Sequence, residues 1–227
     1  MSNLLHFSEH TLQEVALLVM AVLYFFKIRW YFGFTLGKER QPATGMGDTN
    51  PKIGGRHSLG MVLRPGEMES TKSKPMMYVQ FAVLHLGLFL SIALSFIIPY
   101  APGILESQVV LMIFRVILGA AFIVGIMRIY RRITHVYVRA LSTPDDHFSL
   151  ALLTVWLGFA FMAASNNISG GEGIVLTYFL LTAFFLVYVP FSKISHYIFY
   201  PFHRLYIGRH FGRRGVYPMK RDRVQGA

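Results

Sequence analysis

The sequence contains no cysteine. Without thiolates the chain cannot hold an iron–sulfur cluster, and it cannot attach a c-type heme, which needs a Cys-x-x-Cys-His sequence. Any redox metal cofactor would have to be bound chiefly by histidine or methionine, and any iron–sulfur centre would have to belong to a partner. The chain also lacks any combination of residues typical of proteolysis, hydrolysis or phosphoryl transfer, so we expect no independent catalytic site.

Lysine and arginine are absent from three segments, 1–10, 99–108 and 166–172. All 22 basic residues lie elsewhere, and the formal net charge is +11. Basic residues gather on the cytoplasmic side of membrane proteins. The alternation therefore predicts an N-terminus outside and a C-terminus in the cytoplasm. The positive charge is a topology signal, and we expect no nucleic-acid partner.

Apolar residues make up 54% of the chain, more than in an ordinary soluble domain. Several apolar runs approach or exceed the roughly 20 residues that cross a bilayer as a helix. We predict a single membrane domain, 1–227, with an all-α fold in contact with membrane lipid. Its transmembrane helices are expected at about 11–30, 77–98, 109–130, 148–165 and 173–200.

Two polar stretches connect or follow these helices. Residues 31–76 contain many glycines and prolines and show no periodicity. They are read either as a flexible cytoplasmic loop or as a docking segment for a cytoplasmic subunit. Residues 201–227 form a predicted basic cytoplasmic tail. Asp145 and Asp146 precede the fourth helix, and acidic residues stabilise a helix N-terminus, so we interpret this pair as structural.

Only two of the nine histidines, His85 and His196, lie well within apolar runs. A polar imidazole in a membrane helix is costly and marks a functional site by default. His85 is expected about 12 Å from the inner boundary, at about 1.5 Å per residue, and His196 near the inner end of its helix. At similar depth the two rings could bind one heme iron. Alternatively, each makes only an interhelical hydrogen bond, worth about 0.6–2 kcal/mol.

Three cationic residues are further candidates. Arg115 lies inside the third span, where a guanidinium must snorkel or pair; otherwise it contacts a quinone oxygen or a cofactor carboxylate. Lys193 and Arg132 are expected at the inner face. They could pair with heme propionates, or simply anchor the helices on the cytoplasmic side.

Residues 189–196, Val-Pro-Phe-Ser-Lys-Ile-Ser-His, resemble the Pro-Phe-Ser-Arg/Lys-x-x-His signature of the membrane gamma subunit of respiratory nitrate reductase. The resemblance extends to Leu84-His85-Leu86-Gly87, to Arg131-Arg132 and to Tyr137-Val138-Arg139-Ala140. This cytochrome b superfamily includes subunits of heterodisulfide-reductase-like and sulfate-reducer membrane complexes. The resemblance implies a multi-pass subunit of the prokaryotic cytoplasmic (inner) membrane. It would pass electrons between membrane quinone and a cytoplasmic iron–sulfur subunit. Other membrane or periplasmic redox subunits are further candidate partners.

In that family, four histidines usually bind two stacked b hemes. Carried over by position, the inner ligands fall on His85 and His196, and the outer ligands fall near Ser95 and Tyr178. Serine is not a heme ligand, and tyrosine ligates heme only in special cases. We therefore expect one heme b, near the cytoplasmic face. The alternative is a heme-free anchor subunit, in which the two histidines only form hydrogen bonds.

Overall fold

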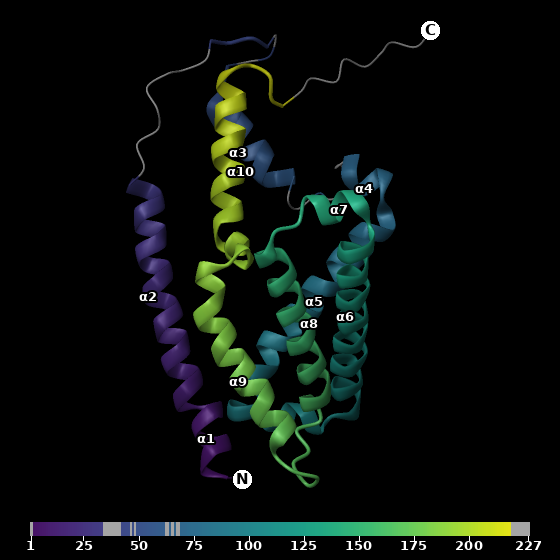
Figure 1. Ribbon diagram of the computed structural model, residues 1–227. Helices are drawn as coiled ribbons and strands as arrows, with labels where there is room; N and C mark the ends of the chain where they lie inside the picture. Colours follow the sequence, from purple (N-terminus) through teal and green to yellow (C-terminus); the bar gives the residue numbers. More distant parts are fainter. Residues whose placement is uncertain are drawn as a thin grey trace. The chain divides into compact units, whose positions relative to one another are not determined.

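The computed structural model describes residues 2–33, 42–45, 47, 49–61, 64, 66 and 69–218. Every regular element among them is a helix (Figure 1). In chain order the elements are α1 (Asn3–Glu9), α2 (Thr11–Gly33), α3 (Pro51–Gly60), α4 (Glu69–Ser73), α5 (Pro75–Tyr100), the 3-10 turn η3 (Pro102–Glu106), α6 (Gln108–Thr134), α7 (Val136–Ala140), α8 (Pro144–Ala163), α9 (Gly173–Tyr188), the 3-10 turns η4 (Val189–Phe191) and η5 (Lys193–Ser195), and α10 (His196–Arg213).

Among the described residues, five helical stretches are long and apolar enough to cross a membrane. They are Asn3–Gly33, Pro75–Tyr100, Gln108–Thr134, Pro144–Ala163 and Gly173–Phe191. Large apolar side chains on these stretches face outward, and Val109, Met112 and Phe89 are each about two-thirds exposed. Such a surface suits contact with lipid rather than with water. The prediction of an all-α, multi-pass membrane protein is confirmed.

The fifth predicted helix, 173–200, differs from the structure. Its regular part ends at Tyr188, and two 3-10 turns separate it from α10. Pro190 has no N–H to donate to the preceding turn, and its ring crowds that turn's carbonyl. Ser192 is extended, with φ −99° and ψ 170°. Hydropathy alone could not place this break, because the apolar run continues through the proline.

The chain divides into two compact units, where the sequence predicted one domain. The transmembrane unit comprises Met1–Tyr31 and Met76–Ile194, and the α3/α10 unit comprises Phe32–Pro75 and Ser195–Ala227. The predicted loop 31–76 therefore contains helices α3 and α4, and part of the predicted tail belongs to α10. Residues 1, 34–41, 46, 48, 62, 63, 65, 67, 68 and 219–227 lie outside the described residues.

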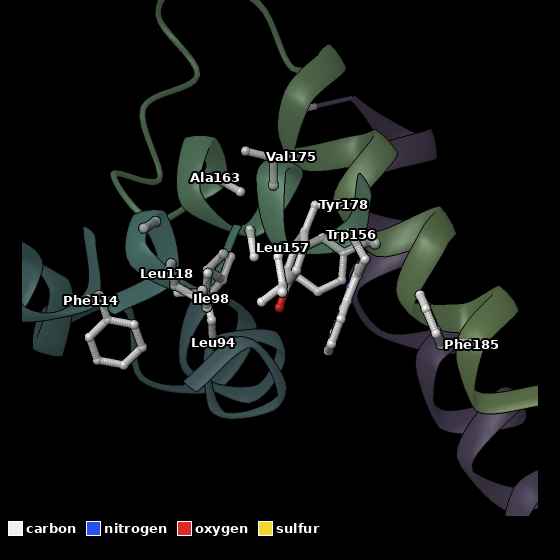
Figure 2. Packing of buried hydrophobic residues seen from close by; sticks show 14 of the residues in the cluster. Leu94, Ile98, Phe114, Leu118, Trp156, Leu157, Ala163, Val175, Tyr178 and Phe185 are labelled. Atoms are coloured by element: carbon white, nitrogen blue, oxygen red, sulfur yellow. The ribbon is translucent and has the colours of Figure 1, made fainter. Parts of the chain in front are cut away.

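The core of the transmembrane unit joins α5, α6, α8 and α9 (Figure 2). Leu94, Leu118 and Leu157 are completely buried there. Helices α5 and α6 approach so closely that a Cβ on Gly87 would overlap the Cβ of Ala121. Small residues allow this close packing, which supplies the association energy that water cannot supply inside a membrane.

Candidate functional site

His85 lies on α5 with an exposed side chain in the transmembrane unit. Its Nδ1 is 2.8 Å from the carbonyl oxygen of Phe81, one helical turn earlier. A carbonyl can only accept, so Nδ1 carries the proton. In the neutral ring the lone pair is then on Nε2, the nitrogen through which iron would be bound. The Phe81 ring lies against the imidazole, with centroids 4.0 Å apart.

His196 is the first residue of α10, directly after the interruption at Pro190. Its side chain is exposed. Ser192 organises the chain just before it: its hydroxyl donates to the Val189 carbonyl (3.1 Å) and accepts from the Ile194 amide (3.2 Å). His196 therefore does not extend the fifth span, as the sequence predicted, but begins a new helix.

The two histidines belong to different compact units, His85 to the transmembrane unit and His196 to the α3/α10 unit. Each is described within its own unit. Their matched depth in the membrane stays a prediction.

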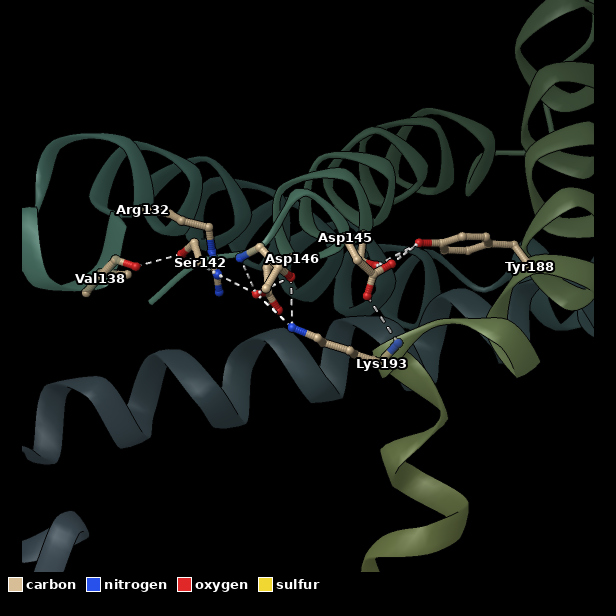
Figure 3. A network of polar contacts seen from close by, with 9 residues as sticks. Arg132, Val138, Ser142, Asp145, Asp146, Tyr188 and Lys193 are labelled. Carbon is tan, nitrogen blue, oxygen red and sulfur yellow. Dashed lines mark hydrogen bonds and ion pairs between the residues drawn. The ribbon is translucent and has the colours of Figure 1, made fainter. Parts of the chain in front are cut away.

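Lys193 and Arg132, the two predicted propionate partners, are brought together by Asp146 (Figure 3). Lys193 Nζ lies 3.0 Å and Arg132 Nη1 3.8 Å from Asp146 Oδ2. The same oxygen accepts from the backbone N–H and hydroxyl of Thr143, both at 2.8 Å, which completes a capping box at the start of α8. The interpretation of the Asp145-Asp146 pair as a helix start is confirmed, and Asp146 also holds both cations.

Asp145 forms the second half of this network. Its Oδ1 accepts from the Tyr188 hydroxyl at 2.7 Å, near the end of α9, and Ser149 lies 3.0 Å from the same hydroxyl. The other carboxylate oxygen of Asp145, Oδ2, accepts from the Lys193 backbone amide at 3.4 Å. The N-terminus of α8 therefore holds the chain on both sides of the Pro190 interruption (Figure 3).

Lys27 contacts the same interruption from α2. Its Nζ donates to the Pro190 carbonyl and lies 5.3 Å from the centroid of the Phe191 ring. A cation 5.3 Å from an aromatic centroid is within the range of a cation–π interaction. Nothing in the local sequence connects residue 27 with residue 190, so this contact could not be predicted from the sequence.

Arg115 is not part of the Asp146 network. It is exposed near the start of α6, whereas Arg132 lies near the end of the same helix. Seventeen residues separate the two along the helix, which is roughly 25 Å at about 1.5 Å per residue. We predicted both arginines as cofactor contacts from the sequence, and the structure places them far apart along α6.

Ser95 and Tyr178, at the positions of the outer heme ligands in the resembled family, are both buried. Figure 2 shows Tyr178 within the packed core. Tyr178 is completely buried, and its hydroxyl donates to the Ser91 carbonyl at 2.6 Å. The indole of Trp156 lies nearly parallel to the phenol, with centroids 6.3 Å apart, and donates to Thr182 at 2.8 Å. These side chains fill the region, so the residues present do not fit a second heme.

The His85 tautomer places the ring lone pair on Nε2, and the His196 side chain is exposed within its own unit. Within the described part of the chain, no three His, Asp or Glu side chains converge to hold a metal ion. A bis-imidazole heme needs only two.

Asp146, Tyr188 and Lys27 are the residues that sequence reasoning missed as parts of this site. Asp146 carried one local signal, its place three residues after the N-cap Thr143. Its ion pair with Lys193 spans 47 positions and has no local signature.

Searches against protein-family models, curated proteins and solved structures find no match to this chain. The resemblance to the cytochrome b superfamily therefore rests on the residues quoted above, and the function that it implies is a proposal.

Proposed function

We propose that this chain is the cytochrome b subunit of a membrane redox complex. In this proposal His85 and His196 bind one heme b, and the subunit passes electrons between the membrane quinone pool and a cytoplasmic iron–sulfur subunit. The observation that carries the proposal is the hydrogen bond from His85 Nδ1 to Phe81, which presents Nε2 as the ligand atom. Metal-binding histidines are commonly oriented by such a bond through the other ring nitrogen.

When bound, heme supplies a one-electron carrier, and the side chains of this protein hold and tune it. The Phe81 carbonyl fixes the orientation and the protonation of the His85 ring. The Asp145–Asp146 network holds Lys193, three residues before His196. In this proposal Lys193 and Arg132, both held by Asp146, would also donate hydrogen bonds to propionates nearby.

The orientation of the subunit follows from its basic residues. The segments 1–10, 99–108 and 166–172 lack Lys and Arg, so the positive-inside rule places them outside and the C-terminus in the cytoplasm. With the resemblance, this supports the cytoplasmic (inner) membrane of a prokaryote as the location.

The packed Tyr178 region supports a single heme. One heme near the inner face cannot carry electrons across a hydrocarbon core of about 30 Å. Transfer then ends at a quinone within the membrane, or continues through a cofactor of another membrane or periplasmic subunit. Arg115, exposed on α6, is the proposed contact for a quinone oxygen.

The alternative is a heme-free anchor subunit of the same kind of complex. One observation favours it: Lys193 and Arg132 already share a carboxylate within the protein, Asp146. Their positions therefore do not require a propionate.

Optical spectra of the purified full-length chain in detergent, oxidised and dithionite-reduced, separate the two functions. A bis-histidine heme gives a sharp alpha band on reduction. We expect about one heme per chain by the pyridine hemochrome assay. His85→Ala and His196→Ala should each abolish the band, while the control His135→Ala, at an exposed histidine after α6, should retain it. A folded wild-type chain without the band would establish the anchor function. Two hemes per chain would contradict our reading of Ser95 and Tyr178.

A further inference from the structure

Two arginines near the end of α6 converge on the first turn of α5, within the transmembrane unit. Arg128 Nη2 donates to the Met77 carbonyl at 3.5 Å, and Arg131 Nη1 donates to the Met77 sulfur at 3.0 Å. Both are weak hydrogen bonds, because the first is at the limit of the distance and a thioether is a poor acceptor. Both side chains are half-buried. The arginine pair, Arg128 and Arg131, is therefore held in place by contacts that engage only one N–H of each guanidinium group.

Arg128 carries a buried donor that lacks an acceptor. Its Nε is shielded from solvent and makes no hydrogen bond within the part of the chain that the structure describes. Its place on α6 explains the burial, because Arg128 follows the buried residues Val124 and Gly125 by one helical turn. An unpaired polar atom in such a place is costly, and more so when it belongs to a charged group. An acceptor that reaches this end of the helix would remove that cost.

An ordinary structural role accounts for other cations at this end of α6. Basic residues in the last turn, Arg131 and Arg132, are favoured by the helix dipole and by the positive-inside rule. Arg132 also has a carboxylate partner in Asp146. An arginine that only anchors a span extends its guanidinium into water, whereas Arg128 keeps its Nε buried. Anchoring therefore does not explain Arg128.

An apolar row continues from Arg131 toward the middle of the span. Met127 and Ile123 precede Arg131 by one and two helical turns, so the three residues lie along one face of α6. Met127 is 48% exposed and Ile123 is 59% exposed. A ligand bound to the arginine pair would have its anionic group at the end of the span and apolar atoms along this row. A phospholipid has this shape, and a free phosphate ion does not.

We propose that Arg128 and Arg131 bind the phosphate of an anionic phospholipid, such as phosphatidylglycerol, in the cytoplasmic leaflet. The predicted orientation places this end of α6 at the cytoplasmic face. Arginine suits a phosphate because its planar fork offers parallel N–H donors to two oxygens. A zwitterionic lipid brings a cation of its own, which two neighbouring arginines disfavour. The site requires no heme, since neither arginine is a proposed heme contact.

The test is native mass spectrometry of the full-length protein in a maltoside detergent. The protein is titrated separately with palmitoyl-oleoyl phosphatidylglycerol, with the matching phosphatidylcholine and with inorganic phosphate. We expect the first phosphatidylglycerol to bind more tightly than the other two probes. Arg128→Gln/Arg131→Gln should weaken its binding at least about tenfold. The matched control, Arg29→Gln/Arg139→Gln, removes the same charge from two exposed arginines of the same unit and should bind like the wild type.

A second variant keeps the charge and changes the donors. Arg128→Lys/Arg131→Lys retains two cations on long stems but loses the parallel N–H groups, so its affinity should lie between those of the wild type and the glutamine variant. Emission of Trp156, which is 4% exposed, checks that each variant is folded. Wild-type affinity in the lysine variant, or equal loss in the glutamine and control variants, would show general charge attraction and overturn the proposal. Equal affinity for phosphatidylcholine, or preference for inorganic phosphate, would also overturn it.

Discussion

Replacement of Asp146 by alanine tests whether one carboxylate holds together the end of α6, the start of α8 and the segment after Pro190. Three contributions are lost. The capping box with Thr143 is worth about 1 kcal/mol, and a negative charge at a helix N-terminus about 0.3–1 kcal/mol. Partly exposed ion pairs contribute about 0.2–1 kcal/mol each, and the Lys193 side chain is 57% exposed, which places that pair at the low end. We expect a loss of about 1.5–3 kcal/mol in the free energy of unfolding.

Asp146→Asn separates the charge from the hydrogen bonds. The amide oxygen still accepts from Thr143, while the ion pairs and the charge at the helix N-terminus are lost. The expected loss is about 0.5–1.5 kcal/mol. Added salt should reduce this difference, because partly exposed charges are screened. The control is Glu106→Gln, at an exposed acid in η3, where we expect a change within about 0.5 kcal/mol.

Tryptophan fluorescence can follow this unfolding, because the chain has two tryptophans. Trp156 is 4% exposed in the core and Trp30 is 68% exposed. In a Trp30→Phe background, Trp156 reports on α8, the helix that Asp146 begins. Equilibrium unfolding would be measured in maltoside micelles with increasing dodecyl sulfate. If Asp146→Ala unfolds within about 0.5 kcal/mol of the wild type, the network does not stabilise this end of the unit.

Three further predictions concern other parts of the transmembrane unit. Tyr178→Phe removes the hydroxyl that donates to the Ser91 carbonyl. The same unfolding assay should show that the free energy of unfolding falls by about 0.6–1.7 kcal/mol, from the average to the largest value measured for such hydrogen bonds in membranes. An unchanged midpoint would mean that this bond contributes nothing to stability. A hydrogen bond from Ser2 lowers the pKa of Glu172 below its ordinary value. The stabilisation from this hydrogen bond should be complete above about pH 4.3, the ordinary pKa of glutamate, and it should disappear as the pH falls through the lower pKa of Glu172 in the folded state. Hydrogen exchange of the Ser2 amide should speed up as the bond is lost. Glu172→Gln should remove this pH dependence. Pro190→Ala restores an amide donor, so hydrogen exchange of residues 189–192 should slow as α9 extends; exchange as fast as in the wild type would show that another feature holds the break.

The boundaries of the second, third and fourth spans could be predicted to within about four residues, because hydropathy over about 20 residues is a local property. The first span begins at Asn3, earlier than the predicted residue 11. The fifth span shows where this approach fails. The apolar run passes through Pro190, and only the backbone geometry shows that α9 ends before it. The prediction of a loop over residues 31–76 missed helices α3 and α4 for a related reason. Helix α3 is rich in glycine and gains its stability from packing against α10, which no local pattern reveals.

The sequence by itself determined the number of spans, the chemistry open to a cysteine-free chain, and the two histidines that could bind heme. These follow from composition and from apolar runs along one segment. Only the tertiary structure decided that Asp146 pairs with Lys193 and Arg132, that Lys27 donates to the Pro190 carbonyl, and that Tyr178 is completely buried in the core. Each of these contacts joins side chains that are distant in sequence. Short-range hydrogen bonds and packing can form them only after the helices have assembled, so no local pattern predicts them.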